Sequence, residues 1–207
     1  MSHPSDPRVL ALHGLRLKGF AAADAVAEVV GLTRDHVEQQ LIALVDEGLA
    51  QYREGRISGF SFTPTGRSEH ERLLTAELDA TGTRATVDQC YQRFLELNNE
   101  LLGLCTAWQL RDVASESVVN DHTDEAYDSG VIDRLARLDE EVQPICTDLS
   151  AALDRMARYG ARLHNARERV QAGDGEYFTA PMIASYHTVW FELHEDLLAT
   201  LGIARSS

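Results

Sequence analysis

The stretch VAEVVGLTRDHV, residues 26–37, decides how the first part of this chain folds. Ala27 is small enough to sit where two helices touch, and Gly31 accepts the left-handed backbone of a tight turn. Thr33 is a good N-cap for a following helix, and Val37 begins an apolar stripe that Leu41 and Leu44 continue at helical spacing. The stretch therefore predicts a helix over 24–30, a turn, and a second helix over 34–47.

The sequence on either side adds a preceding helix and a β-hairpin. Asp6-Pro7 is a typical helix start and Lys18-Gly19 a typical stop, which predicts a helix between them. Residues 49–53 and 57–62 have the composition of strands joined by the turn 54–56. Thr63-Pro64 then starts another helix. Residues 1–75 are thus expected to form one domain of helices with a hairpin.

This pattern resembles the winged helix-turn-helix domains of the MarR and PadR families of bacterial regulators. The resemblance covers about a third of the chain. The matching residues form a spaced set of small, apolar, turn and capping positions: Ala27, Gly31, Leu32, Thr33, Val37, Leu41, Leu44, Glu47, Gly48, Leu49, Thr63, Pro64, Gly66 and Arg67. The chain beyond this domain matches neither family.

The resemblance implies that the helix over 34–47 enters the DNA major groove while the hairpin, or wing, touches the backbone. Gln39 would then pair with an adenine edge, and Arg34 with a guanine or a phosphate. Arg53 and Arg56 flank the hairpin turn and would contact the backbone. The residues expected to contact double-stranded DNA are Thr33, Arg34, His36, Gln39, Arg53, Arg56 and Arg67.

The net charge of −14 runs against general nucleic-acid binding, because neutralising phosphates drives that affinity. The acidity is uneven, however. Residues 1–75 hold 8 Lys and Arg against 10 Asp and Glu, whereas residues 76–207 hold 11 against 23. A DNA-binding first domain therefore stays compatible with the charge. The alternative is a regulatory or scaffold subunit whose winged helix binds protein, which the acidic Asp35 and Glu38 favour.

The remainder, residues 76–207, is expected to be an all-helical domain for dimerisation or effector binding, which makes the chain mainly α. Helical periods run over 67–78, 86–112, 131–171 and 180–201. Residues 113–130 are polar and are expected to form a loop. Pro144 is expected to kink or split the third of these segments. The arginines over 155–169 are expected to form a surface of ion pairs, with an anion site as the less favoured interpretation.

Both tryptophans lie near histidines or asparagines, which suggests a pocket for a small-molecule effector between the helices over 86–112 and 180–201. The residues expected to line it are Asn98, Trp108, His187, Trp190, Phe191 and His194. A packed core with histidines at its rim is the competing interpretation. The two-turn spacing of His187 and His194, about 10.5 Å of rise, is too long for one metal ion, so no metal is expected.

The remaining features indicate a non-enzymatic cytoplasmic regulator without cofactors. The sequence has no phosphate loop, nucleophile elbow or His-Glu-x-x-His motif, and no signal peptide or membrane-spanning run. Its three cysteines, Cys90, Cys105 and Cys146, are expected to be buried thiols. One winged helix contacts little DNA, so a homodimer on two half-sites is expected. The expected function is that of a ligand-responsive transcriptional regulator.

Overall fold

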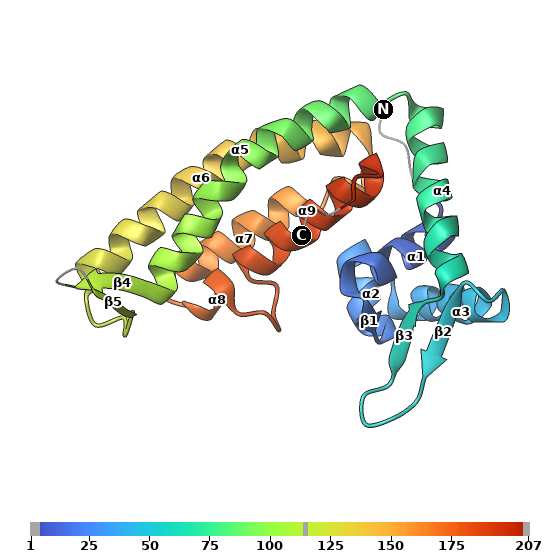
Figure 1. Cartoon of the computed structure of the whole chain (residues 1–207), viewed down its shortest axis with the longest axis horizontal. Helices are drawn as coiled ribbons and strands as arrows, with labels where there is room; N and C mark the ends of the chain where they lie inside the picture. The colour runs from blue at the N-terminus through green and yellow to red at the C-terminus, as the bar shows by residue number, and fades with distance from the viewer. Residues whose placement is uncertain (1–4, 114–115, 205–207) are drawn as a thin grey trace. The chain divides into compact units, whose positions relative to one another are not determined.

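The computed structural model describes residues 5–113 and 116–204, and it is mainly helical with small antiparallel sheets (Figure 1). It contains two compact units. Unit 1 extends to Val87 and also takes in Ala151–Arg155 and the chain from Glu195 onward. Unit 2 comprises Asp88–Ser150 and Met156–His194. The domain boundary expected after residue 75 falls within a helix of unit 1.

From Pro7 to Thr81, unit 1 contains four helices and a three-stranded antiparallel sheet. Its elements are α1 (Pro7–Lys18), β1 (Phe20–Ala21), α2 (Ala23–Val30), α3 (Arg34–Asp46), β2 (Ala50–Arg53), β3 (Gly59–Phe62) and α4 (Pro64–Thr81). The strands lie in the order β1-β3-β2, so Phe60 of β3 faces Ala21 on one side and Tyr52 on the other. The helices and the hairpin were predicted from the sequence, whereas the two-residue strand β1 was not.

The helix ends lie where the capping residues predicted them. The Asp6 carboxylate accepts a hydrogen bond from the Arg8 amide at the start of α1, and Gly19 follows its last residue. Gly31, at φ 73° and ψ 27°, makes the left-handed turn after α2. Thr33 then caps α3. The turn between α2 and α3 is therefore formed by local chemistry.

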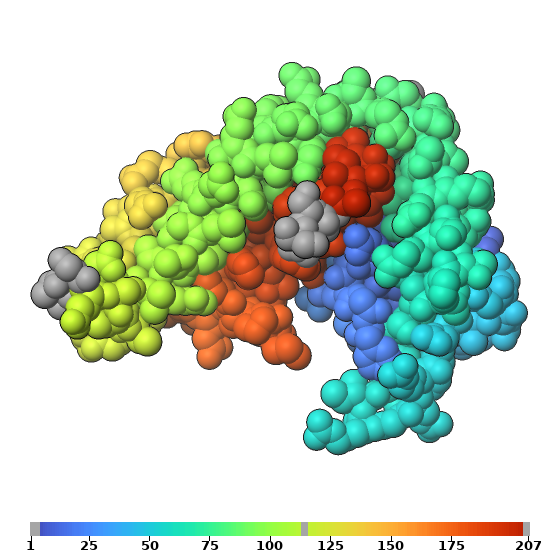
Figure 2. All heavy atoms as spheres, viewed as in Figure 1, coloured from blue at the N-terminus to red at the C-terminus, as the bar shows by residue number. Residues whose placement is uncertain are grey.

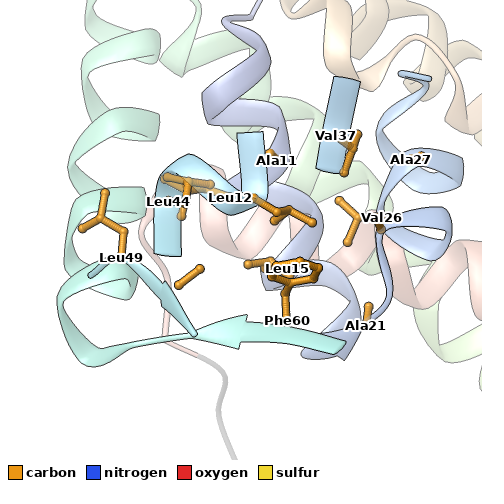
Figure 3. Close-up of a cluster of buried hydrophobic side chains, with 13 residues drawn as sticks. Ala11, Leu12, Leu15, Ala21, Val26, Ala27, Val37, Leu44, Leu49 and Phe60 are labelled. Carbon is orange, nitrogen blue, oxygen red and sulfur yellow. The ribbon is translucent and has the colours of Figure 1, made fainter. Parts of the chain in front are cut away.

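A single apolar core holds these elements together (Figure 3). Leu12 and Leu15 of α1 contribute to it, together with Val26 of α2, Val37 of α3 and Phe60 of β3. Ala27 is also buried, which agrees with the prediction that this small residue lies where two helices touch. Since one face of α3 is committed to this core, its opposite face is left for solvent or a partner.

The TPTGR segment, residues 63–67, fixes α4 against the end of α3. The Thr63 hydroxyl accepts from the Gly66 amide at 3.0 Å and lies 2.7 Å from the Gly48 carbonyl oxygen, to which it donates. A Cβ on residue 66 would lie only 1.7 Å from the Leu49 carbonyl oxygen. Glycine is therefore required here for close approach of two backbones.

The remaining elements are mostly those of unit 2: α5 (Arg84–Gln109), β4 (Leu110–Val113), β5 (Glu116–Val119), α6 (Glu125–Ala152), the 3-10 turn η1 (Asp154–Met156), α7 (Tyr159–Gln171), α8 (Glu176–Thr179) and α9 (Tyr186–Leu201). Helices α5 and α6 run antiparallel (Figure 1). Arg93 near the start of α5 pairs with Asp148 near the end of α6 at 2.6 Å. Tyr127 at the other end of α6 donates to the Ala107 carbonyl oxygen at 2.9 Å.

Two predictions for this region were wrong. The segment 113–130 is not a continuous loop, because residues 110–113 and 116–119 pair as the hairpin β4–β5 and α6 begins at Glu125. Pro144 does not split the helix, since it lies inside α6, and the kink expected as the other outcome stays a prediction. Pro144 and Glu140, whose carbonyl loses its helical donor, are both exposed, so water can satisfy that carbonyl. The helix ends instead at Ala152, where the chain enters Ala151–Arg155 of unit 1.

Candidate functional site

The outward face of α3 presents the residues that the sequence singled out for DNA. Thr33, Arg34 and Gln39 are exposed and His36 is half-buried. Thr33 is also the N-cap of α3, because its hydroxyl oxygen accepts a hydrogen bond from the His36 backbone amide at 3.4 Å. The first two turns of α3 thus present one amide side chain and one imidazole to a partner.

Arg34 is already engaged by carboxylates. Its Nε lies 3.0 Å from the Asp24 Oδ1 atom, and its Nη2 lies 3.6 Å from the Glu38 Oε2 atom. Both contacts are solvent-exposed and therefore weak, but together they balance the guanidinium charge. A base or phosphate contact by Arg34 would compete with these partners for its guanidinium group.

The β2–β3 hairpin projects from the helices of unit 1 (Figure 2). Arg53 lies opposite Gly59 in the ladder, and Arg56 lies in the turn. The turn is closed by the Ser58 hydroxyl, which accepts from the Gly55 amide and lies 3.2 Å from the Gly55 carbonyl oxygen. Both arginines are exposed, and neither takes part in an ion pair within residues 5–113 and 116–204. They are the cations of this surface most available to a phosphate.

Arg67 lies in the first turn of α4, with its guanidinium carbon 5.8 Å from the centre of the Phe62 ring. It is exposed, and the described part of the chain places no carboxylate against it. The ring orients the side chain without neutralising its charge. Arg67 is therefore also available to an anionic partner.

Beside α3 lies an apolar groove of about 430 Å³. Its lining includes Ile42 of α3 and Tyr52 of β2, which are each 52% exposed, and the paired side chains of Asp24 and Arg34. Exposed apolar side chains in a groove are typical of protein contact surfaces. This groove is the structural feature that favours the alternative, protein-binding interpretation of unit 1.

The six residues predicted to bind an effector do not line one cavity. Trp190 donates from Nε1 to the Asn98 Oδ1 atom at 3.0 Å and stacks on Phe94 at 4.6 Å between ring centroids. The His194 ring lies 5.4 Å from that of Phe94, so it belongs to the same packed group. His187 is half-buried and Phe191 is 38% exposed.

Trp108 lies elsewhere in unit 2. Its indole stacks on Phe178 of α8 with 4.8 Å between centroids and a 7° angle between planes. It lines a cavity of about 650 Å³ together with His122, Asp128 and Glu176, and none of the other five predicted residues is part of that lining. The predicted pocket is therefore corrected. Trp190 packs with Phe94 and His194, whereas Trp108 packs with Phe178. Of the two tryptophans, Trp108 lines this cavity and Trp190 does not.

A buried polar cluster in unit 1 was not anticipated from the sequence. Arg155 was expected on the surface, but its side chain is only 2% exposed. Its Nε lies 2.9 Å from the Glu77 Oε2 atom, and its Nη2 donates to the Thr200 hydroxyl at 2.6 Å. Its Nη1 pairs with Asp196. The prediction that Arg155 lies on the surface is wrong. Its carboxylate partners are 78 and 41 residues away in the sequence, so the sequence around Arg155 does not reveal them.

Two buried histidines continue this cluster. His13 lies with Nε2 3.0 Å from the Asp196 Oδ2 atom and with Nδ1 3.0 Å from Nε2 of His70. Burial, followed by the charges of His13 and Arg155, lowers the pKa of His70 to about 2. Burial would raise the pKa of Asp196, but its contacts with Arg155 and His13 hold that pKa below its usual range. His70 is therefore neutral and Asp196 ionised at physiological pH.

Other chemistry is limited in the described residues. No group of three or more His, Cys, Asp or Glu residues among them is arranged to hold a metal ion. Burial raises the pKa of the Cys105 thiol to about 11 and that of Cys146 to about 12. Burial also raises the pKa of Cys90. These thiols are therefore poor nucleophiles at neutral pH, as expected for structural cysteines.

No helix of the described chain is both long and apolar enough to cross a membrane. Comparisons with protein-family models, with curated proteins and with solved structures find no significant match to this chain.

Proposed function

We propose that unit 1 is a winged helix-turn-helix that binds double-stranded DNA, with α3 in the major groove and the β2–β3 hairpin on the backbone. The observation that carries this proposal is the hairpin with two exposed arginines, Arg53 and Arg56, that have no ion-pair partner in the described chain. Strand β2 follows α3 in the chain, and one face of α3 is committed to the core. Cations without local partners are what phosphate contacts require.

The roles follow from exposure and charge. Gln39 and His36 of α3 are the base-reading residues, because they project from its first two turns. Arg67 contacts a phosphate. Arg34 is a weaker candidate than the sequence suggested, since a DNA contact competes with Asp24 and Glu38.

The function proposed for the whole chain is that of a non-enzymatic transcriptional regulator that acts as a homodimer in the cytoplasm. Two α3 helices on related half-sites would supply the contact area that one lacks. A small-molecule effector bound by unit 2 would alter the affinity for DNA by favouring one arrangement of the dimer over another.

Removing the two hairpin arginines tests the proposal. The variant Arg53→Ala/Arg56→Ala should weaken binding to all duplexes to a similar extent, because backbone contacts carry no sequence information. The slope of log affinity against log salt should become shallower by about 2, roughly one per lost phosphate contact. Fluorescence anisotropy with mixed-sequence duplexes from 50 to 300 mM salt measures both effects.

Arg72→Ala is the matched control, because Arg72 is an exposed arginine of unit 1 that is engaged by Glu69 at 2.8 Å. It should bind duplexes like the original chain. If the original chain shows no salt-dependent affinity for any duplex, the DNA-binding proposal is wrong. The apolar groove with Ile42 and Tyr52 would then favour the second candidate function, a scaffold subunit whose winged helix binds protein.

A further inference from the structure

The cavity beside Trp108 has a rigid aromatic wall. The Phe178 ring stacks on the indole, and the centroid of the His122 ring lies 4.4 Å from that of Trp108 at an angle of 42°. A Cβ on Gly175 would approach the Trp108 Cζ2 atom to 3.0 Å, so glycine lets the turn before α8 lie against the indole. The volume of about 650 Å³ falls within the range of small-molecule sites.

His122 is held in an unusual backbone conformation at this cavity. It is the non-glycine residue with positive φ, 58°, in the described chain. The Asn120 Oδ1 atom accepts from the His122 amide at 3.2 Å, and Asp128 lies with Oδ2 2.9 Å from His122 Nδ1. Since a carboxylate only accepts, His122 Nδ1 is the donor in this contact. Such a constrained residue at a cavity wall is a typical feature of binding sites.

The charges at the cavity are acidic. Its lining contains Asp128 and Glu176 but no lysine or arginine. Asp128 is satisfied internally, because Asn120 donates to its Oδ1 atom at 2.8 Å while His122 donates to Oδ2. The Glu176 carboxylate is exposed and has no hydrogen-bond or ion-pair partner within the described residues. Glu176 is thus the group free to balance a positive charge.

We propose that this cavity binds a small planar aromatic cation, with its ring against Trp108 and His122 and its ammonium group near Glu176. Ile132 and Val170 supply the apolar remainder of the lining. An anion would meet two carboxylates, and a neutral ring would forgo the charge interaction. The proposal concerns unit 2 alone and does not depend on whether unit 1 binds DNA.

Three probes with the same indole ring and different charges test the proposal: tryptamine, a cation, tryptophol, which is neutral, and indole-3-acetate, an anion. Isothermal titration calorimetry of the full chain, without DNA, should rank their affinities in that order. For about a dozen non-hydrogen atoms, a tryptamine Kd on the order of 100 µM is expected.

Variants locate the bound probe. Glu176→Gln should weaken tryptamine about fivefold or more and leave tryptophol unchanged, because only the charge interaction is lost. Ala180→Phe fills part of the cavity and should weaken both probes. Asp174→Asn is the matched control, since Asp174 lies two residues before Glu176, is not part of the lining and is paired with Arg169 at 2.6 Å.

Circular dichroism of each variant verifies that it is folded. Equal affinity for the three probes, or the absence of binding at millimolar concentration, would overturn the proposal. So would a Glu176→Gln variant that binds tryptamine as tightly as the original chain does.

Discussion

Replacing Arg155 by Met should destabilise unit 1 by about 3–5 kcal/mol, because the change leaves two buried carboxylates without their common cation. Glu77 is 8% exposed in its side chain and Asp196 is 2% exposed, so water cannot take the place of the guanidinium. Thr200 also loses its donor. Urea unfolding at pH 7.5, followed by circular dichroism, measures the loss.

Two further variants separate the charge from packing. Arg93→Met removes an arginine whose pair with Asp148 is exposed, 38% and 50% for the two side chains, and should have little effect on stability. Adding Glu77→Gln and Asp196→Asn to Arg155→Met should recover much of the stability, because no ionised carboxylate then remains uncompensated. If Arg155→Met unfolds at the same urea concentration as the original chain, the cluster does not stabilise unit 1.

The local chemistry of unit 1 was predictable because each signal acts over a few residues. The cap at Thr33, the left-handed Gly31 and the Thr63-Pro64 helix start all require neighbours within four positions. The buried cluster had no such signal. Arg155 lies among charged residues in the sequence, and the separations to Glu77 and Asp196 show that only the tertiary fold brings these groups together.

The predicted effector pocket was wrong for a geometric reason. Trp190 bonds to Asn98, and Trp108 lies ten residues further along α5. Ten residues of helix span about 15 Å, so the two tryptophans cannot share one small pocket through that helix. The sequence indicated that both tryptophans lie in helices with polar neighbours. It did not indicate at which position along the helix each tryptophan meets its packing partners. The partner of Trp108 is Phe178, in a short helix, α8, that the periodicity did not indicate.

The hairpin β4–β5 was not predicted because its strands are short and their exposed apolar residues lack a clear alternation. Val118 and Val119 are 37% and 76% exposed, so neither core-facing periodicity nor burial marks the strand. Asn120 closes the hairpin through its backbone N–H, which donates to the Gln109 carbonyl oxygen at 2.8 Å. That contact spans eleven residues and is not visible in the composition of the segment.

The buried His70 should make the chain less stable in mild acid. Its pKa in the folded state is about 2, against an ordinary value of 6.5, so between these values the unfolded chain binds a proton that the folded chain excludes. Stability therefore falls as the pH is lowered through 6.5, by about 2–3 kcal/mol between pH 6.5 and 4.5. Asp196, whose pKa is also lowered, has the same sign of dependence, but its stabilising effect is lost only as the pH falls below about 3.8, so it does not contribute in this range.

The groups that face His70 act on its pKa in both directions. His13 and Arg16 of α1 and Arg155 lower it together with burial, whereas Asp196 of α9 raises it. The Phe62 ring, 5.5 Å away, adds an apolar neighbour without charge. Burial is the largest of these causes, so the expected effect depends on the side chain staying enclosed.

His70→Gln isolates the contribution of this one residue. Its amide can donate to or accept from His13 Nδ1, which lies 3.0 Å from His70 Nε2, but it takes up no proton in this pH range. The free energy of unfolding in urea, measured at pH 7.5, 6.5, 5.5 and 4.5, should lose about one proton's worth of pH dependence, about 1.4 kcal/mol per pH unit, in this variant. His187→Gln, at a half-buried histidine of unit 2, should keep the original dependence. Identical pH dependence of His70→Gln and the original chain would show that His70 titrates alike in the folded and unfolded states, and that its enclosure does not exclude the proton.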